Sequence, residues 1–334
     1  MFSLIIEFNK KNIKNASKFL NSISMSASKL VNQEIIFLIA DNAREVLKLI
    51  DNFALNNKNL KFKIIYSTKA LSLNQQIYFI LQQVSKQYLW FLDPLSKFEN
   101  DNKIESVLKV LDSDQPDIVE IKPVFNGITK WTPQYRLWLD PLKKYDLNNN
   151  PKIIAYTFPF LLNKILNRKV LDDIFKLKLM SNLKNDSSSN LSSEILYLAL
   201  LNARTYLWIK DETIFINLNE ANVPSYNYVL NEWRRILAAY EKKNIYLDEI
   251  EYARAYYLLV VLTGLYGNKK MHLIFKDPQL ICKNYYEKLT KLGQNKMQKF
   301  VSKNPYMQAD NPEINLLKSI QPVGKWNKIF GKLE

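Results

Sequence analysis

The first 125 residues alternate between short apolar runs and longer amphipathic ones, and this alternation constrains the fold more than any other feature. The apolar runs, rich in Ile, Phe and Tyr, occupy residues 2–8, 33–40, 62–67, 88–93 and 117–125. Runs of this kind are typical of buried strands. The stretches between them have helical periodicity, as in the apolar face formed by Leu73, Ile77, Ile80 and Val84. Strands that alternate with helices predict βαβ crossovers and a mostly parallel sheet, so the predicted fold class is α/β.

After the fifth predicted strand the pattern loosens. Residues 190–203 predict a helix, for which Asn190 or Ser192 can serve as the N-cap. Residues 204–217 predict a pair of strands. The polar stretch at 181–190 predicts a mobile loop over a cleft.

Three long helical patterns follow, at residues 226–244, 247–267 and 278–303. The change of character places a domain boundary near residue 220. We therefore predict an α/β domain at 1–220 and a helical C-terminal domain at 221–334, which ends in a basic amphipathic tail.

The chain is strongly basic, with 47 Lys and Arg against 32 Asp and Glu and a formal charge of +15. A surplus of this size indicates an anionic partner such as nucleic acid, an anionic membrane or a phosphorylated substrate. Nucleotide bias in a genome is the alternative explanation, because Lys, Asn and Ile are abundant while Gly totals only 6. The sequence contains no recognised nucleic-acid-binding motif, so we predict no specific nucleic-acid partner.

The single cysteine and the single histidine exclude several kinds of site. Cys282 alone cannot form an internal disulfide and fits a reducing compartment. His272 alone excludes a zinc site with several histidines and argues against a Ser-His-Asp mechanism. The longest apolar stretch, at 255–267, is shorter than the ~20 residues that a membrane helix needs, and the first residues do not form a signal peptide. We therefore predict a cytoplasmic protein.

Polar residues follow the predicted strands at their carboxyl ends, where open parallel sheets bind ligands. They are Glu7, Asn9, Asp41, Asn42, Ser67, Lys69 and Asp93. Strand ends are often polar, so each residue alone says little. Their coincidence in one βαβ array predicts a cleft.

The order of these motifs resembles the N-terminal half of family 2 glycosyltransferases, which have the GT-A fold. Phe8-Asn9 stands near the Tyr-Asn of the family, Leu73-Asn74 stands near its Arg-Asn, and "KQYLWFLD" at 86–93 follows the strand that leads to its D-x-D motif. The resemblance is close over residues 2–125 and loose over 126–220. It implies a GT-A fold and a UDP-sugar donor. The residues that it places in the nucleotide-sugar site are Asn9, Asp41, Asn42, Lys69, Asn74 and Asp93.

The D-x-D motif itself is broken, because it reads Asp93-Pro94-Leu95. In the family one Asp of this motif contacts the ribose and the last one binds Mg²⁺ or Mn²⁺. Asp93 matches the first position, but Leu95 stands at the metal position and leucine has no ligand atom for a cation. The resemblance thus implies a divalent cation as cofactor, while Leu95 supplies no metal ligand.

The catalytic base of the family belongs to an acidic pair at the start of a helix in the second half of the domain. "LSSEILYLALL" resembles that helix and places Glu194 at the base, which deprotonates the acceptor hydroxyl for attack with inversion. The alternative for Glu194 is a first-turn acid that the helix dipole favours.

Aromatic and basic residues have two interpretations each. Trp131, Tyr135 and Trp138 lie in the region that shapes the acceptor cleft of relatives, although such rings also fill cores. Arg234 and Arg235 could clamp phosphate or lie on an exposed helix face.

The C-terminal tail interleaves apolar residues with lysines. The apolar residues are Leu317, Ile320, Trp326, Ile329 and Phe330, and the lysines are Lys318, Lys325, Lys328 and Lys332. The pattern suits a segment that lies on an anionic membrane surface, here the inner face of the cell membrane. The alternative is a terminal helix that docks on the preceding helices and leaves its lysines in solvent.

The leading hypothesis from the sequence is an inverting family 2 glycosyltransferase that transfers a hexose from a UDP-sugar to a hydroxyl of a glycolipid or surface glycan. The alternative is an inactive pseudo-glycosyltransferase that serves as a binding or scaffold module, since the metal Asp is missing. A nucleic-acid-binding module is a third hypothesis, and only the charge supports it.

Overall fold

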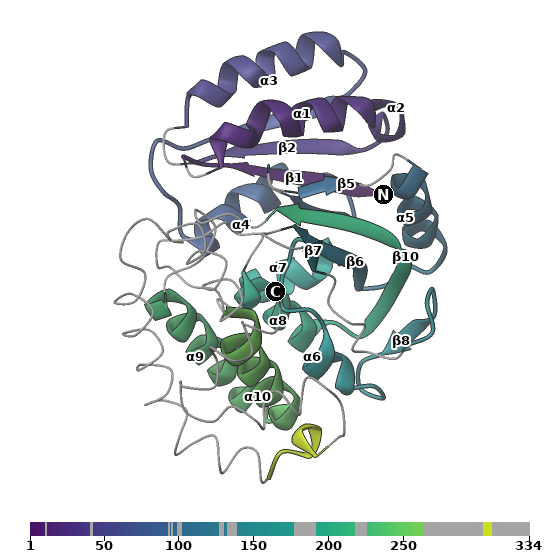
Figure 1. The fold of residues 1–334 in the computed structure, drawn as a ribbon, viewed down its shortest axis with the longest axis vertical. Helices are drawn as coiled ribbons and strands as arrows, with labels where there is room; N and C mark the ends of the chain where they lie inside the picture. Colours follow the sequence, from purple (N-terminus) through teal and green to yellow (C-terminus); the bar gives the residue numbers. More distant parts are fainter. Residues whose placement is uncertain are drawn as a thin grey trace.

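The computed structural model describes residues 1–10, 12–40, 43–92, 94, 96–98, 102–126, 130–131, 139–176, 192–217, 226–262 and 303–308 (Figure 1). Every structural statement below concerns these residues.

The first half of the sheet is parallel, as predicted. It consists of β1 (Phe2–Phe8), β2 (Glu34–Ile39), β3 (Lys61–Tyr66) and β4 (Tyr88–Leu92), in the order β3-β2-β1-β4. Every residue of β1, β2 and β4 is buried, because helices cover both faces of the sheet. By contrast, β3 ends the order and its residues are exposed or half-buried.

Helices fill the predicted intervals between these strands. They are η1 (Ile13–Asn15), α1 (Ala16–Met25), α2 (Ala27–Leu30), α3 (Glu45–Asn56), α4 (Leu73–Gln83) and α5 (Asn102–Ser113). In Figure 1, α1 and α3 lie over one face of the parallel strands and α4 lies over the other. A capping box starts α4: the Ser72 hydroxyl accepts from the Gln75 N–H at 3.2 Å, and the side-chain oxygen Oε1 of Gln75 accepts from the Ser72 N–H at 2.9 Å.

The second half of the sheet is mixed. Its strands are β5 (Ser96–Phe98), β6 (Ile118–Asn126), β7 (Lys130–Trp131), β8 (Lys144–Asp146), β9 (Lys164–Asn167) and β10 (Thr205–Asn217). The order continues β4-β9-β6-β10-β5, with β9 antiparallel to both β4 and β6. Because β9 is antiparallel to both of its neighbours, β4 and β6 are parallel to each other. The strands β6 and β10 therefore run in the same direction as β1–β4.

The predicted strand pair at 204–217 is wrong, because this segment forms the single strand β10. Both halves of β10 pair in parallel with β6, and a bulge between Ile209 and Thr213 absorbs the extra residues. The first half also pairs with β8 and the second with β5. Parallel pairing with β6 on both sides of the bulge therefore keeps the segment a single strand.

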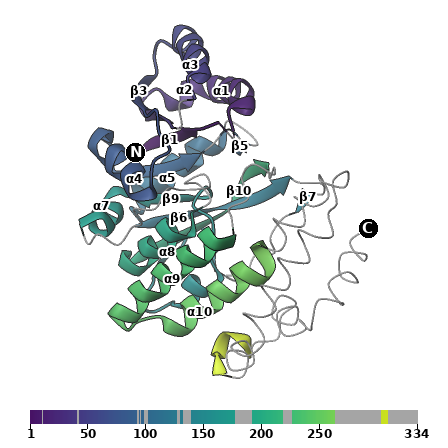
Figure 2. The same ribbon diagram turned by 90° about the vertical axis from the view of Figure 1, so that its left-hand side faces the viewer.

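Helices after the parallel strands complete the core. They are α6 (Lys152–Tyr156), α7 (Arg168–Lys176), α8 (Ser193–Asn202), α9 (Tyr226–Lys243), α10 (Leu247–Tyr256), the π-helix η4 (Tyr257–Val261) and η5 (Pro305–Met307). Val229, Trp233 and Ile236 of α9 belong to the same cluster of buried apolar side chains as the sheet. Figure 2 shows α8, α9 and α10 stacked below the sheet. The fold is thus an α/β sheet followed by helices, and the boundary predicted near 220 lies outside the described residues.

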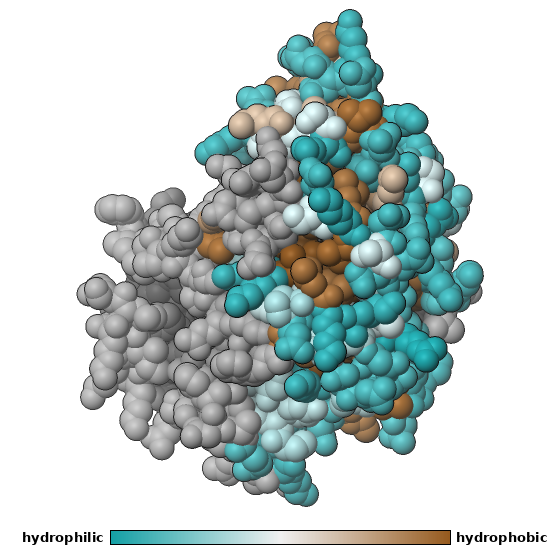
Figure 3. Space-filling view, turned by 90° about the vertical axis from the view of Figure 1, so that its right-hand side faces the viewer, coloured by the Kyte–Doolittle hydropathy of each residue, from teal (hydrophilic) through white to brown (hydrophobic). Residues whose placement is uncertain are grey.

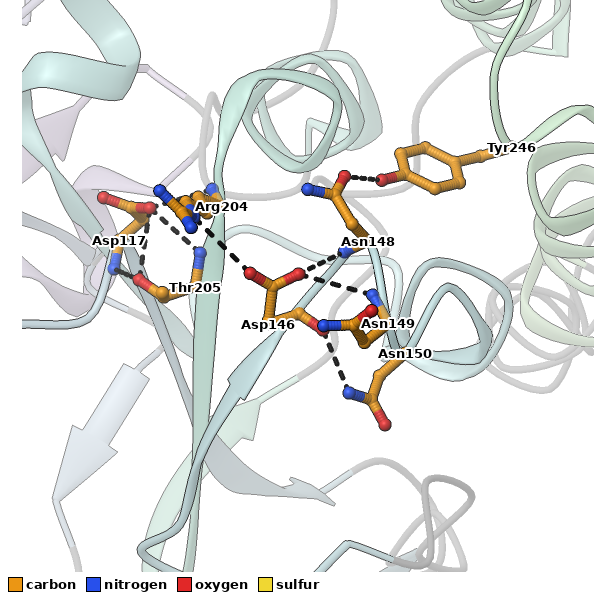
Figure 4. Close-up of polar contacts among 8 residues, drawn as sticks. All are labelled: Asp117, Asp146, Asn148, Asn149, Asn150, Arg204, Thr205 and Tyr246. Atoms are coloured by element: carbon orange, nitrogen blue, oxygen red, sulfur yellow. Dashed lines mark hydrogen bonds and ion pairs between the residues drawn. The ribbon is translucent and has the colours of Figure 1, made fainter.

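Polar side chains join the amino ends of β6 and β10 (Figure 4). One carboxylate oxygen of Asp117 accepts from the N–H groups of Arg204 and Thr205 at 2.8 and 2.9 Å and from the Thr205 hydroxyl at 3.1 Å. The Arg204 Nε lies 3.4 Å from the Asp146 carboxylate at the end of β8, and the Tyr246 hydroxyl donates to the turn that follows β8. This network stabilises the end of the sheet opposite to the strand carboxyl ends.

Among the described residues, no helix combines the length and the hydropathy that crossing a membrane requires. The coloured part of the face in Figure 3 is mostly hydrophilic, with hydrophobic side chains gathered in a patch near the centre and in smaller groups elsewhere. The predicted tail at 314–334, His272 and Cys282 lie outside the described residues.

Candidate active site

The carboxyl ends of the parallel strands share one edge of the sheet, and several predicted site residues lie there. Asn9 follows β1, Lys69 follows β3, and Asn74 lies in the first turn of α4. Trp131 pairs with Phe125 near the end of β6, so its backbone lies at this edge too. The predicted residues Asp41, Asn42, Asp93, Tyr135 and Trp138 lie outside the described residues, as does Leu95.

The exit of β1 is a turn closed by two asparagines. The Asn9 N–H donates to the Asn12 side-chain oxygen at 2.9 Å, and the Asn12 N–H donates to that of Asn9 at 3.2 Å. The Asn12 amide also donates to the Glu7 carbonyl at 2.9 Å. The turn leaves Asn9 half-buried at the edge and buries Asn12, which sequence reasoning missed although it lies one turn after Asn9.

The exit of β3 presents a cation beside a helix start. The Ser67 hydroxyl accepts from the Lys69 N–H at 3.2 Å and donates to the Lys69 carbonyl at 2.9 Å, which fixes the turn. Lys69 is exposed, and Asn74 is half-buried just after the Ser72 cap of α4. Helix starts favour anions, so the charge of Lys69 and the α4 dipole both attract an anion to this edge.

An arginine that the sequence did not single out joins the exits of β2 and β3. The Arg44 Nε donates to the Tyr66 hydroxyl at 2.9 Å. This hydrogen bond raises the pKa of Arg44. Both residues are exposed, so they add a cation and an aromatic ring to the same edge.

The start of α8 lies toward this edge as well. Because only two residues separate the end of α8 from the start of β10, α8 ends near the amino edge and its first turn lies toward the carboxyl edge. Ser192 is the N-cap, one of the two predicted, and its hydroxyl accepts from the Ile195 N–H at 3.3 Å. The Ser193 hydroxyl donates to the Pro159 carbonyl at 3.1 Å and so ties the first turn to the segment that leads into β9.

Glu194 is a buried, ion-paired carboxylate. It is 0% exposed, and both of its oxygens accept from Arg235, from Nε at 3.0 Å and from Nη2 at 2.7 Å. The Arg235 side chain is 25% exposed. Burial opposes the charge of Arg235, but its hydrogen bonds to Glu194 raise its pKa above the ordinary value. Of the two predicted arginines, Arg235 thus binds a carboxylate, while Arg234 is exposed and donates to Asn231 at 3.0 Å.

A second buried acid, Glu232 of α9, completes this group. One of its oxygens accepts from the Ser192 hydroxyl and from the Glu194 N–H, each at 3.0 Å. Burial and the neighbouring Glu194 charge raise the pKa of Glu232 to about 8, so it is neutral at pH 7. Sequence reasoning missed it. The available signal was its place beside Trp233 on the apolar face of α9.

Another buried charged group lies within the sheet. Glu120 of β6 accepts from the Thr157 hydroxyl at 2.6 Å, from the Tyr206 hydroxyl, and from the Asn163 amide at 3.4 Å. The Lys164 ammonium of β9 lies 3.4 Å from Glu120, and both side chains are almost fully buried. This group joins β6, β9 and β10 from inside.

Lys164 is held mainly by backbone carbonyls. Its ammonium donates to the Phe158 carbonyl at 2.8 Å, to the Phe160 carbonyl at 3.4 Å and to the Asn163 side-chain oxygen at 2.8 Å. Burial lowers the pKa of Lys164 to about 8, although Glu120 acts in the opposite sense.

The residue at the metal position of the D-x-D motif does not fit the divalent cation that the family resemblance implies. Mg²⁺ and Mn²⁺ prefer several oxygen ligands, and Leu95 offers none at the expected position. Within the described parts of the chain, no three His, Cys, Asp or Glu side chains come together as a metal site requires. No catalytic step is therefore assigned to a metal.

Neither a protein-family model nor a curated protein sequence matches this chain. Solved structures do. The chain is similar to residues 1–349 of S. aureus TarS in complex with UDP-GlcNAc, with a TM-score of 0.59 and 17% identity over 78% of this chain and 76% of that one. The complex of the same TarS fragment with UDP gives a TM-score of 0.57 at 17% identity, over 79% and 73% of the two chains. At this identity the likeness shows the fold, and the chain has the predicted α/β, GT-A-like fold followed by a helical region.

Proposed function

We propose that this protein is a nucleotide-sugar glycosyltransferase that moves a hexose from a UDP-sugar to a hydroxyl acceptor. The observation that supports the proposal is the position of Asn9, Lys69 and Asn74 at the carboxyl edge of a GT-A-like sheet, toward which the first turn of α8, with Glu194, also lies. The similar TarS structures were solved with UDP-GlcNAc and with UDP, which supports a uridine nucleotide as the donor.

The nucleotide half of the proposed site comprises Asn9, Asp41, Asn42, Lys69, Asn74 and Asp93. Asp41 and Asp93 hold the nucleoside. Lys69, which is exposed beside the start of α4, neutralises the diphosphate that a metal ion would otherwise neutralise. Activity is therefore expected to depend weakly or not at all on a divalent cation.

In the proposed reaction the acceptor oxygen attacks the anomeric carbon as the bond from that carbon to UDP breaks. UDP leaves with the bonding electron pair, Glu194 takes the acceptor proton, and the configuration inverts. A carboxylate oxygen can accept more than one hydrogen bond, so Arg235 does not exhaust the capacity of Glu194. Because Glu194 is 0% exposed, acceptor binding has to open the contacts that cover it.

The acceptor half of the proposed site comprises Trp131, Tyr135 and Trp138, whose rings would stack on a sugar of a glycolipid or surface glycan. The basic tail would hold the enzyme at an anionic membrane through its lysines, each of which contributes ~1 kcal/mol near such a surface. Co-sedimentation with anionic vesicles tests this part. The full chain should pellet and a chain that ends at residue 310 should not, while neutral vesicles should pellet neither.

Calorimetric titration with UDP, UDP-GlcNAc, UDP-glucose and UDP-galactose, with and without Mn²⁺, tests the donor site. We expect binding of UDP and of at least one donor in both conditions. Asp93→Asn should weaken UDP binding about tenfold or more, because it removes the charge that holds the ribose. The control Asp112→Asn, on α5 and outside the proposed site, should bind as the wild type does. Absence of any uridine nucleotide binding would favour the scaffold alternative.

A further inference from the structure

We propose that Glu232 and Arg235 of α9 are positioning residues for Glu194, so that the first helix after the sheet forms part of the catalytic unit. The inference rests on the proposed function, in which Glu194 is the base. It assigns a role to two side chains that do not contact the substrate in that mechanism.

Glu232 holds the start of α8. The first N–H groups of a helix lack partners within the helix and need acceptors from elsewhere. Ser192 accepts from the Ile195 N–H at 3.3 Å, and Glu232 accepts from the Glu194 N–H at 3.0 Å. The Ser192 hydroxyl donates to the same Glu232 oxygen at 3.0 Å. One carboxyl from α9 therefore fixes both the backbone of Glu194 and the cap that precedes it.

Arg235 fixes the side chain of Glu194. Its Nε and Nη2 donate to the two carboxylate oxygens at 3.0 and 2.7 Å, so the planar fork sets both the position and the rotation of the carboxylate. A lysine at this position would keep the charge but would not define the plane.

Further contacts hold α9 in register along α8. The Tyr240 hydroxyl donates to the Tyr197 carbonyl at 2.8 Å. The Lys243 ammonium donates to the Leu201 carbonyl at 3.2 Å and to the Asn202 side chain at 2.8 Å. The two helices thus run side by side in the same direction, and a shift of α9 would displace Glu194.

The charge state of Glu232 matters because the group is crowded. Glu194 faces it from α8, and Arg235 faces it from α9 with Tyr228 nearby. Burial and Glu194 raise the pKa of Glu232 to about 8. Above that pH, Glu232 becomes a second anion that competes with Glu194 for Arg235, and the orientation of Glu194 is expected to loosen.

The test is donor hydrolysis, in which water is the acceptor and UDP release is measured, with Arg235→Lys compared against Arg234→Lys. We expect Arg235→Lys to lower kcat at least tenfold and to change the KM for UDP-GlcNAc less than twofold. Arg234 is the matched control because it is adjacent, exposed and bonded only to Asn231 among the contacts described. Its lysine variant should keep kcat within twofold.

Glu232→Gln supplies a readout that a purely structural role would not move. Its side-chain oxygen can still accept from Ser192 and from the Glu194 N–H, as the neutral carboxyl does. At pH 7 its kcat should lie within threefold of the wild type. Above pH 8 the wild-type kcat should fall and that of Glu232→Gln should not, since only the wild type ionises there. Circular dichroism confirms that each variant is folded, and this pH comparison decides the question if Arg235→Lys does not fold.

Each negative result has a separate meaning. If the wild type hydrolyses the donor but Arg235→Lys behaves like Arg234→Lys, or Glu232→Gln keeps the wild-type pH profile, this inference is wrong and the proposed function stands. If the wild type binds no uridine nucleotide and releases no UDP, the proposed function is wrong and the inference with it.

Discussion

Two groups of buried charge lie close together in this protein, and they differ in balance and in place. The first pairs one acid, Glu120, with one base, Lys164, inside the sheet, where neutral donors and carbonyls satisfy both. The second combines two acids, Glu194 and Glu232, with one partly exposed base, Arg235, where α8 begins.

The two groups share a connecting segment. The Phe158 and Phe160 carbonyls accept from Lys164, and the Pro159 carbonyl between them accepts from Ser193 at the start of α8. The sheet group therefore fixes the segment Phe158–Phe160, to which the first turn of α8 is hydrogen-bonded.

The difference in charge balance and exposure indicates a different role for each group. A balanced, fully enclosed pair contributes to the specificity and rigidity of the fold, and breaking it is costly. An unbalanced group with a partly exposed member can change its charge state within an accessible pH range, and this property is useful in an active site. We expect the sheet group to affect mainly stability and the α8 group to affect mainly activity.

The largest effect on stability is expected from Lys164→Met. This change leaves the Glu120 charge buried without its ion-pair partner and removes the donor from two carbonyls. We expect the free energy of unfolding to fall by about 3–5 kcal/mol, measured by urea denaturation. Lys143→Met is the control, because Lys143 is 61% exposed in its pair with Asp140 and should contribute less than ~1 kcal/mol. Equal losses in the two variants would contradict the comparison.

Arg235→Met should have a smaller effect. It leaves Glu194 buried without its donor, but the Arg235 side chain is 25% exposed and solvent screening reduces the loss. We expect about 2 kcal/mol by the same denaturation assay. A loss as large as that of Lys164→Met would mean that the α8 group is as structural as the sheet group.

The pH dependence of stability should have opposite signs in the two groups. The folded chain holds the Glu232 proton from pH 4.5 up to about 8, where the unfolded chain has lost it, so this carboxyl makes stability fall as pH rises through that window. Lys164 is neutral in the folded chain above about 8 but protonated in the unfolded chain up to 10.5, so it makes stability rise between those values.

Each slope is at most roughly 1.4 kcal/mol per pH unit, because one proton is involved. Chemical denaturation at a series of pH values should show the falling slope in the wild type and a flatter profile in Glu232→Gln. The rising slope above pH 8 should remain in that variant. If Glu232→Gln left the lower window unchanged, the assignment of that slope to Glu232 would be wrong.

The smallest effect is expected at the start of α4. This helix start is held by the neutral side chains of Ser72 and Gln75, whereas buried acids lie beside the start of α8. Ser72→Ala removes one half of the capping box with Gln75 and should cost about 1 kcal/mol of stability. Ser113→Ala, near an exposed helix end, should change stability by less than ~0.5 kcal/mol. Thermal unfolding of the two variants side by side is the measurement.

Local sequence patterns predicted much of the fold. The strands β1–β4 and β6 and the helices between them follow the apolar periodicity, and Ser192 was recognisable as a cap from its type and place. Short elements were not predictable from the local sequence pattern. The strand β9 is only Lys164–Asn167 and owes its conformation to pairing on both sides, with β4 and β6.

The α8 group was beyond the reach of the sequence for a similar reason. Glu232 contacts Glu194 across 38 positions of chain, and that contact exists only after α9 packs on α8. The sequence could propose Glu194 as a base or as a first-turn acid, but the ion pair with Arg235 depends on tertiary packing. The roles of all the predicted site residues stay predictions, and Asp41, Asn42, Asp93, Tyr135 and Trp138 also lie outside the described residues.

The most direct test of the central proposal is UDP release from UDP-GlcNAc by the wild type and by Glu194→Gln, each with EDTA and with Mn²⁺. We predict that the wild type turns over in EDTA, and that Glu194→Gln loses about 10²–10⁴ of that rate while it still binds UDP. Turnover that strictly requires Mn²⁺, or a Glu194→Gln variant as fast as the wild type, would contradict the account.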